Sequence, residues 1–417
     1  MPRRRRVVIT GLGVIAPNGI GKEAFWKAIT EGKSGIGRIT RFDASEFPSQ
    51  IAGEVRDFDP SQFLEAKEAR RLDRFSQLGI VASFMAVNDA GLSLEKEDRH
   101  RIGVFLGAAA AGLGYAQAQY DTFREKGFRR INPHIIYAAF SDACAGSISL
   151  NLGLKGPSTT VAAACASGAA SIGLGFHAIR NGEADAVLAG GADAPITSMI
   201  LASYCAANAL STRNGEPQKA SRPFCIDRDG FVLAEGAGIL VLEDLDRAHK
   251  RGAHIYAEVC GFGMTCDSYH MTQSAPEGEE AARALRLALR EAQIDPRAID
   301  YVSAHGTSTP INDRVETMVI KKVFGDHAYN LSVSSIKSMI GHSHGGCGAI
   351  ETIACALAIE NQTIPPTINY DAPDPECDLD YVPNRCRPGR VNVVMKSSFG
   401  FGGKNVALVV KRFNGSS

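Results

Sequence analysis

The sequence lacks an excess of charge of either sign, because its 45 basic residues balance its 45 acidic residues. Without a net field, the chain has no global electrostatic attraction for nucleic acid or for an anionic membrane. It also lacks any apolar run that approaches the ~18 uncharged positions of a membrane-spanning helix. The composition therefore predicts a protein with no nucleic-acid partner and no membrane span.

The ten cysteines lack the paired CxxC spacing of zinc and redox sites. No segment resembles a cleaved secretory signal, so we expect free thiols and a cytoplasmic protein. His342, His344 and Cys347 lie close enough in sequence to suggest a metal site. Glycines separate them and a fourth ligand is missing, so we expect no metal.

The pattern of apolar residues predicts the fold class. Short β-branched runs alternate with amphipathic helices such as 279–292, and the alternation begins again near residue 252. Such alternation is typical of parallel sheets covered by helices on both faces. The 417 residues are enough for two such units. We therefore expect an α/β protein of two similar halves, 1–251 and 252–417, that share one core.

Residues 11–16, GLGVIA, superficially fit the GxGxxA fingerprint of a dinucleotide site. Pro17 and Asn18 stand where that motif needs its helix to continue. We therefore interpret the glycines as a turn after a strand at 7–10, and we expect no nucleotide there.

Cys165 lies between a predicted strand at 159–164 and a predicted helix at 169–180. This places the thiol on a tight turn at the positive end of a helix. The partial charge and free N–H groups of a helix N-terminus favour thiolate over thiol, and the thiolate is the nucleophile. The pattern indicates a nucleophilic cysteine, although most buried cysteines are only small apolar core residues.

Two histidines occupy comparable positions. His305 follows the predicted strand 301–304, and His342 follows the predicted strand 331–334 among glycines. Groups at the carboxyl ends of central strands converge on the ligand crevice of α/β folds. Glu351 falls in an apolar helix, where a carboxylate is costly unless it is paired. We expect Lys337 to pair with Glu351 behind two catalytic histidines.

A cysteine and two histidines are compatible with more than one reaction. A hydrolase needs one histidine as base and a group that orients it, which Asn312 or Asp313 could supply. The second histidine would then have no task. A decarboxylation that develops negative charge on a thioester oxygen uses two neutral donors instead.

Motifs along the whole chain carry a family resemblance. In order they are VVITGLGVIAPNG, GPSTTVAAACASG, AGGADA, ALSTRNGEPQKASRPF, RDGFVLAEGAG, AHGTSTPINDRVE, SSIKSMIGH and KSSFGFGGKN. On these motifs the chain resembles the elongating β-ketoacyl-acyl-carrier-protein synthases of the thiolase superfamily, and among them the synthase II type. The resemblance implies a thiolase-like fold with a five-layer αβαβα core, and usually a homodimer, with a heterodimer as the other form.

The resemblance also implies an acyltransferase of fatty-acid synthesis. Cys165 would accept an acyl group, and decarboxylation of malonyl-acyl-carrier protein would then yield 3-oxoacyl-acyl-carrier protein. No cofactor is implied, because the substrates arrive on the phosphopantetheine of acyl carrier protein. The alternative is a ketosynthase of a dedicated polyketide, polyene or unusual-lipid pathway, with or without a silent partner subunit. A further alternative is a chain-length subunit without catalysis, against which the intact Cys165 argues.

Roles are implied residue by residue. Cys165 matches the acyl-accepting nucleophile, His305 and His342 the decarboxylation histidines, and Lys337 and Glu351 their supporting pair. The remaining matches are Phe401 as gate and oxyanion-hole donor, Thr307 and Thr309 on the phosphopantetheine arm, Phe399 and Ala110 at the substrate, Asp267 on a second mobile loop, and Lys67, Arg70, Arg71, Arg129 and Arg130 as the carrier-protein docking patch.

The chain departs from the family pattern at three places. After His342, Ser343 and His344 replace leucine-like residues, and Lys404 replaces a threonine beside the gate. Ala110 stands where synthase II typically has a bulky isoleucine that limits the acyl pocket. We expect the smaller side chain to admit long, branched, rigid or unsaturated chains.

Overall fold

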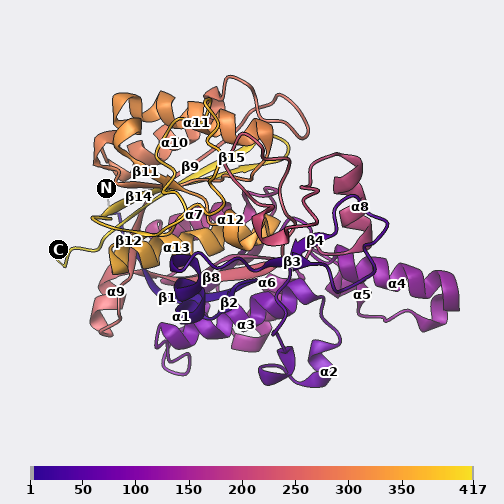
Figure 1. Cartoon of the computed structure of the whole chain (residues 1–417). Coiled ribbons are helices and arrows are strands. Elements are labelled where there is room, and N and C mark those ends of the chain that lie inside the picture. Colours follow the sequence, from indigo (N-terminus) through magenta and orange to yellow (C-terminus); the bar gives the residue numbers. More distant parts are fainter. Residues whose placement is uncertain (1–3, 416–417) are drawn as a thin grey trace.

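A single mixed sheet runs through the computed structural model, which describes residues 4–415 (Figure 1). Its principal strands are β1 (Val7–Ala16), β5 (Ile102–Gly107), β6 (Ser158–Val161), β7 (Ala186–Asp193), β8 (Gly236–Asp244), β9 (Ala257–Cys266), β10 (Tyr301–Ser303), β11 (Ser332–Ser334), β14 (Val393–Gly400) and β15 (Lys404–Lys411). They lie in the order β11-β10-β14-β15-β9-β1-β8-β7-β5-β6, and the short β2 (Gly19–Ile20) adds to β1. The sheet therefore extends from one half of the chain into the other.

The two halves repeat one topology. Each half has five principal strands, which can be counted one to five in chain order. From the outer edge of the sheet inward, the first half has the strand order 3-2-4-5-1, namely β6, β5, β7, β8 and β1. The second half has the same strand order, 3-2-4-5-1, formed by β11, β10, β14, β15 and β9. The halves meet where β1 pairs antiparallel with β9, Val7–Ile9 opposite Ala257–Val259. The expected fold of two similar halves is confirmed, whereas the boundary at residue 252 stays a prediction.

Helices form three layers around the two half-sheets (Figure 1). On the outer faces, α3 (Arg74–Asp89) packs on β1 and β8, and α10 (Glu279–Ala292) packs on β9 and β15. Between the half-sheets, α7 (Ser167–Arg180) and α13 (Cys347–Asn361) contact strands of both halves. This is the five-layer arrangement, and it places the helix that follows Cys165 at the centre of the molecule.

Paired glycines allow each outer helix to lie against its sheet. A Cβ at Gly11 or Gly13 of β1 would overlap the backbone of α3, and a Cβ at Gly261 or Gly263 of β9 would overlap the backbone of α10. The interpretation of GLGVIA as a turn is therefore wrong, because β1 continues through it to Ala16. Its glycines let a helix approach a strand, which is a requirement of packing.

The expectation of parallel sheets is only partly right. β5 pairs parallel with β6 and β7, and β10 pairs parallel with β11 and β14. The strands β8 and β15 pair antiparallel with both of their neighbours. β15 follows β14 after a short turn at 401–403, and so short a connection permits only antiparallel pairing.

The buried strand expected at 159–164 is shorter and more exposed than its residues suggest. β6 ends at Val161, and its first two residues are exposed because it pairs only with β5 at the edge of the sheet. After β6 the chain leaves the sheet to form the turn that carries Cys165. Among the helices not expected from the sequence are α4 (Leu113–Lys126), α5 (Ile135–Ala138), α6 (Ala143–Leu152) and α8 (Ser198–Ala206).

The remaining helices are α1 (Lys22–Thr30), α2 (Ala66–Ala69), α9 (Leu245–Lys250), α11 (Pro310–Phe324) and α12 (Lys337–Ile340). The short strands β3 (Ile36–Arg38) and β4 (Ile51–Gly53) pair with each other, as do β12 (Thr363–Ile364) and β13 (Arg387–Pro388). Across residues 4–415, none of the helices is both long and apolar enough to cross a membrane.

We predict that Gly13→Ala lowers the free energy of unfolding by about 1–3 kcal/mol, because the added methyl group forces α3 away from β1. Urea denaturation measures this change. Gly215→Ala is the matched control, since a Cβ there meets no atom within 4 Å. Equal stability of the two variants would contradict the packing role of Gly13.

Candidate active site

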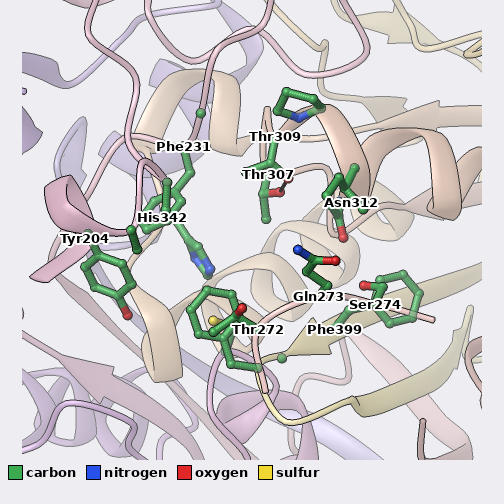
Figure 2. Close-up of a pocket in the computed structure, with 18 of the residues that line it drawn as sticks. Tyr204, Phe231, Thr272, Gln273, Ser274, Thr307, Thr309, Asn312, His342 and Phe399 are labelled. Atoms are coloured by element: carbon green, nitrogen blue, oxygen red, sulfur yellow. Dashed lines mark hydrogen bonds between the residues drawn. The ribbon is translucent and has the colours of Figure 1, made fainter. Parts of the chain in front are cut away.

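A cavity of about 640 Å³ brings together residues from both halves of the chain (Figure 2). Cys165, His305 and His342 line it, with Phe399 and Phe401 on one side and Thr307 and Thr309 on another. The residues that the sequence placed at separate strand ends therefore do meet. The cavity is also lined by residues that the sequence did not single out, among them Tyr204, Phe231 and Gln273.

Cys165 sits on a tight turn between β6 and α7. Ala164 adopts a left-handed conformation with φ of 50°, and a backbone bridge joins Ala163 to Cys165. The Ser167 hydroxyl accepts the N–H of Ala163 at 2.8 Å and donates to the carbonyl of Ala164 at 2.6 Å. These hydrogen bonds hold the thiol at the base of the cavity, two residues before the helix begins.

Burial raises the pKa of the Cys165 thiol to about 11. The charge of Lys337 and the backbone N–H groups of Phe401 and Cys165 act in the opposite direction. Burial therefore opposes the expected effect of the helix end, because the loss of hydration disfavours the thiolate while the N–H groups favour it. The two N–H groups nevertheless face the sulfur, where the oxyanion hole was expected.

His305 is fixed by its neighbours in one orientation. Glu316 accepts the backbone N–H groups of His305 and Gly306, each at 2.7 Å. The ammonium of Lys337 donates to the His305 carbonyl at 2.7 Å and lies 3.4 Å from Nδ1. A cation can only donate, so Nδ1 is the acceptor and Nε2 carries the proton.

A buried charge cluster lies behind His305. Glu351 pairs with Lys337 through one carboxylate oxygen and with Lys396 at 2.8 Å through the other. The expected pair of Lys337 and Glu351 is therefore present, but Lys396 was missed. Lys396 is the first residue of the motif KSSFGFGG, and this motif was the sequence signal that could have indicated it. The structure shows that Lys396 is buried in β14.

Both active-site histidines are neutral. The pKa of His305 and that of His342 lie well below 6.5, first because of burial and second because of the nearby charge of Lys337. Their rings meet almost at right angles, with centroids 5.4 Å apart. Nδ1 of His342 has no hydrogen-bond partner among the described residues. The site thus offers two neutral imidazoles beside one thiol.

Two loops meet at the mouth of the cavity. The N–H of Gly402 donates to the Met271 carbonyl at 2.7 Å, and the N–H of Asp267 donates to the Gly403 carbonyl at 2.9 Å. The Asp267 carboxylate accepts from Asn405 at 2.6 Å and from the N–H of Ala275 at 3.0 Å. Asp267 therefore ties the loops together without lining the cavity.

The other residues expected at the substrate differ in placement. Thr307 and Thr309 line the cavity and share a hydrogen bond of 2.9 Å, and Figure 2 shows both threonines on one wall with Asn312. Phe399 lines it beside His305, with ring centroids 5.8 Å apart. Ala110 is not among the lining residues and packs in an apolar cluster that includes Phe231. Its effect on acyl-chain length stays a prediction.

Asp193 is a buried carboxylate that the sequence did not mark. It accepts backbone N–H groups from Ala109, Ala110, Ala111 and Gly345 at distances of 2.7–3.0 Å. Burial raises its pKa to about 7. Asp193 thereby joins the segment after His342 to the segment that contains Ala110.

The five basic residues expected to dock a carrier protein are all exposed. Lys67, Arg70 and Arg71 lie on and just after α2, and Arg129 and Arg130 lie in the 3₁₀ turn Phe128–Arg130. Their side chains are therefore free to meet an acidic partner, although docking itself stays a prediction.

Two alternative assignments fail on geometry. Asp313 is engaged by Arg228 at 3.5 Å and by the N–H of Phe224 at 2.9 Å. The amide of Asn312 donates to Asp313 at 3.1 Å, so neither candidate is hydrogen-bonded to a histidine as a hydrolase requires. Within residues 4–415 no group of three or more His, Cys, Asp or Glu residues is arranged to hold a metal ion. The thiol of Cys347 instead donates to the His344 carbonyl.

The profile described as "Beta-ketoacyl synthase, N-terminal domain" matches residues 4–248, and the corresponding "C-terminal domain" profile matches residues 256–371. The chain belongs to the β-ketoacyl synthase family. The resemblance drawn from the motifs is thereby confirmed, and the protein is an enzyme of the ketoacyl-synthase acyltransferase type.

Curated relatives of this β-ketoacyl synthase match it over nearly its whole length. A protein of Synechocystis sp. named 3-oxoacyl-[acyl-carrier-protein] synthase 2 is 48% identical and covers 98% of this chain and 99% of its own. Proteins of the same name from Coxiella burnetii (48% identical) and Staphylococcus aureus (45% identical) cover 98–99% of this chain and 99–100% of their own.

Solved structures share the fold of this β-ketoacyl synthase. The ishigamide ketosynthase/chain length factor has a TM-score of 0.93 and 38% identity, covering 99% of this chain and 100% of its own. A type II PKS ketosynthase solved in complex with its acyl-carrier protein has a TM-score of 0.90 and 38% identity over the same shares.

We predict that alkylation of Cys165 by iodoacetamide accelerates about tenfold for each pH unit between about pH 7 and 9, because the thiolate fraction rises until the pH reaches the pKa. Peptide mass spectrometry measures alkylation of this cysteine, and a small-molecule thiol serves as the control for the reagent. A plateau from neutral pH upward would mean that the helix end, and not burial, sets the pKa.

Proposed function

We propose that this protein elongates acyl chains by decarboxylative Claisen condensation on acyl carrier protein, in fatty-acid synthesis. The arrangement of one thiol beside two neutral histidines carries the proposal. The curated relatives of the same length, named 3-oxoacyl-[acyl-carrier-protein] synthase 2, support this chemistry and product.

In the first half-reaction, Cys165 takes an acyl group from the phosphopantetheine thioester of acyl carrier protein. The sulfur loses its proton, a new carbon–sulfur bond forms, and the carrier thiol leaves as the protonated product. Negative charge on the tetrahedral oxygen is stabilised by the N–H groups of Cys165 and Phe401. Thr307 and Thr309 are placed to hold the phosphopantetheine arm.

In the second half-reaction, His305 and His342 donate hydrogen bonds to the thioester oxygen of malonyl-acyl-carrier protein. The bond to the carboxylate breaks, carbon dioxide leaves, and the electron pair becomes an enolate. The enolate carbon attacks the acyl-Cys165 carbonyl, the carbon–sulfur bond breaks, and the thiolate recovers a proton. The high pKa of Cys165 favours this last step, because it makes the thiol the stable resting form.

The fixed orientation of His305 supports its role as a donor. Lys337 occupies the Nδ1 side of the ring, so the proton on Nε2 is available to a substrate oxygen. Lys337, Lys396 and Glu351 act as positioning residues through His305 and touch no substrate themselves.

The carrier protein is the expected partner of the exposed basic residues. An acyl carrier protein with an acidic surface would be attracted electrostatically to the exposed side chains of Lys67, Arg70, Arg71, Arg129 and Arg130. The solved relative in complex with its acyl-carrier protein supports this class of partner.

A ketosynthase of a dedicated polyketide or unusual-lipid pathway is the second candidate. Structural relatives described as type II PKS and ishigamide ketosynthases favour it at 38% identity. The curated fatty-acid-type relatives match at 45–48% identity, which makes fatty-acid elongation the better-supported pathway. The mass of a copurified partner chain distinguishes the two.

We also propose that a second copy of this chain pairs with the outer edge of β6 to form a dimer. Within residues 4–415, β6 pairs with β5 alone, so its other edge is available to pair with the β6 of a two-fold-related copy. Leu150 of α6, the helix that contacts β6, is 76% exposed, and Ile136 is 70% exposed on α5, which is hydrogen-bonded to α6 through Tyr137 and Ser147. The hydrogen bond between Ser149 and Ser158 links α6 to β6.

The cytoplasm is the proposed location. All ten cysteines are free, as expected in a reducing compartment.

We predict that Cys165→Ala abolishes acyl transfer, because no other side chain supplies the nucleophile. Intact-protein mass spectrometry after incubation with acyl-carrier protein measures acylation, and product analysis with malonyl-carrier protein measures condensation. Cys386→Ala, which alters a partly buried cysteine far along the chain, is the control and should retain both activities. Elongation by Cys165→Ala at a rate near that of the unmodified protein would remove the assignment.

We predict that the protein is a homodimer and that Leu150→Glu shifts it toward monomer, because a buried charge at the apolar seam is costly. Analytical ultracentrifugation measures the mass. Tyr329→Glu alters a residue that is 56% exposed and lies outside α5, α6 and β6, so it should leave the dimer intact. A monomeric unmodified protein would overturn the proposed interface.

A further inference from the structure

A third histidine lines the cavity but has no role in the steps above. His344 is the first residue of the 3₁₀ turn His344–Gly346, two positions after His342. It is 2% exposed and contributes to the cavity wall. Its ring centroid lies 5.2 Å from that of Tyr204, 6.1 Å from that of Phe231 and 5.3 Å from that of His342.

The imidazole of His344 is polar in apolar surroundings. Nε2 has no hydrogen-bond partner among the described residues. Tyr204 and Phe231 belong to a cluster whose buried members include Ala110, Ile196, Ile200, Leu201, Leu210 and Leu233. An unpaired buried polar atom costs about 1–3 kcal/mol, so native proteins seldom keep one without a reason.

The backbone holds His344 in this position. Its φ of 45° is left-handed, an uncommon conformation for a residue with a side chain. On one side the N–H of Gly345 donates to Asp193 at 2.7 Å, and on the other the thiol of Cys347 donates to the His344 carbonyl at 2.9 Å. A Cβ at Gly345 would lie only 2.7 Å from the Asp193 carboxylate, so the turn fits closely against that residue. The ring therefore has little freedom to leave the wall.

The ring is neutral, because burial lowers the pKa of His344 to about 4. A neutral imidazole has one N–H donor and one acceptor nitrogen. Such a ring can donate to a carbonyl oxygen, or accept from or donate to a hydroxyl. A carbonyl or hydroxyl oxygen is therefore a sufficient partner for His344.

We propose that His344 hydrogen-bonds an oxygen on the acyl chain carried by Cys165, and so selects chains that bear a hydroxyl or keto group over saturated chains. This inference rests on the condensation proposed above, and it names the substrate class of the same site. An oxygen-bearing acyl chain fits the polyketide or unusual-lipid pathway that is the second candidate, so the test below also bears on the choice of pathway. A site that is built to pair an oxygen discriminates against the analogue that lacks it, because the protein group is then left unpaired.

A charge on His344 would lower the pKa of His342, but His344 is itself neutral, so this influence gives it no role at neutral pH. No hydrogen bond joins its ring to that of His342, and the two rings stand almost perpendicular at 86°. The metal alternative has no ligand set in the described chain. Thr307 and Thr309 are proposed to hold the phosphopantetheine arm, whereas the ring of His344 lies against Phe231, which belongs to the apolar cluster that includes Ala110. We therefore place the acyl chain, and not the arm, beside His344.

The test compares two acyl-carrier proteins of equal chain length, one saturated and one with a hydroxyl or keto oxygen. The full-length protein is used unmodified, as His344→Leu, which fills the space without a polar atom, and as His344→Gln, which keeps a donor and an acceptor. His100→Leu, at an exposed surface position, is the control for the substitution itself. The first-order rate of Cys165 acylation is measured for each chain by intact-protein mass spectrometry.

We expect the unmodified protein to acylate faster with the oxygen-bearing chain, and His344→Leu to reduce this preference by about three- to tenfold, the effect of one net hydrogen bond. His344→Gln should retain part of the preference, and His100→Leu all of it. The inference is overturned if the unmodified protein shows no preference, a result that stands even if His344→Leu fails to fold.

A second readout separates the acyl chain from the decarboxylation histidines. Release of carbon dioxide from malonyl-carrier protein without an acyl donor should be the same in His344→Leu as in the unmodified protein. A parallel loss of decarboxylation and of acylation with both chains would mean that His344 acts on His342 and would overturn the inference. If the unmodified protein transferred neither chain to Cys165, the proposed condensation itself would fail.

Discussion

The pairing of one buried carboxylate with two buried lysines underlies the chemistry of this site. Glu351 lies between Lys337 and Lys396, so two ammonium groups share one carboxylate in the buried core. Their positive charge helps to keep His305 and His342 neutral, and Lys337 fixes which nitrogen of His305 holds the proton. Removing one member would leave a charge unpaired in the core, so the cluster is structural and electrostatic at once.

The duplicated sheet explains why these groups meet. Cys165 follows a strand of the first half, whereas His305 and His342 follow strands of the second half. The halves are joined at β1 and β9, and α7 and α13 pack between them. The helix α7 orients the nucleophile and α13 supplies Glu351, so the central layer connects the two sets of catalytic residues.

Much of the fold and the site could be predicted from the sequence, because local signals coincide with tertiary demands there. The helix at 279–292 has one continuous apolar face, and the structure has a helix with the same bounds. His305 lies two residues after β10 and Cys165 lies in the turn after β6, so their convergence follows from their placement at strand ends. His342 is separated from β11 by the short helix α12, which the sequence did not indicate. Glycine patterns were less informative, since Gly11 and Gly13 resemble a turn and instead admit a helix.

What could not be predicted depends on contacts between distant segments. The exposed helix α4 buries none of its residues fully, so no apolar stripe marked it. Lys396 and Asp193 acquire their roles only from the residues that surround them in space. The pKa of Cys165 is the clearest case: the helix end is visible in the sequence, but the burial that outweighs it is a property of the folded cavity.

The raised pKa of Cys165 also bears on how the protein survives between catalytic cycles. Peroxides and other oxidants attack the thiolate form of cysteine. Because burial raises the pKa of Cys165 to about 11, the thiol form predominates at neutral pH. The idle nucleophile is therefore largely protected from oxidative loss, and it becomes reactive when a thioester substrate is held beside it.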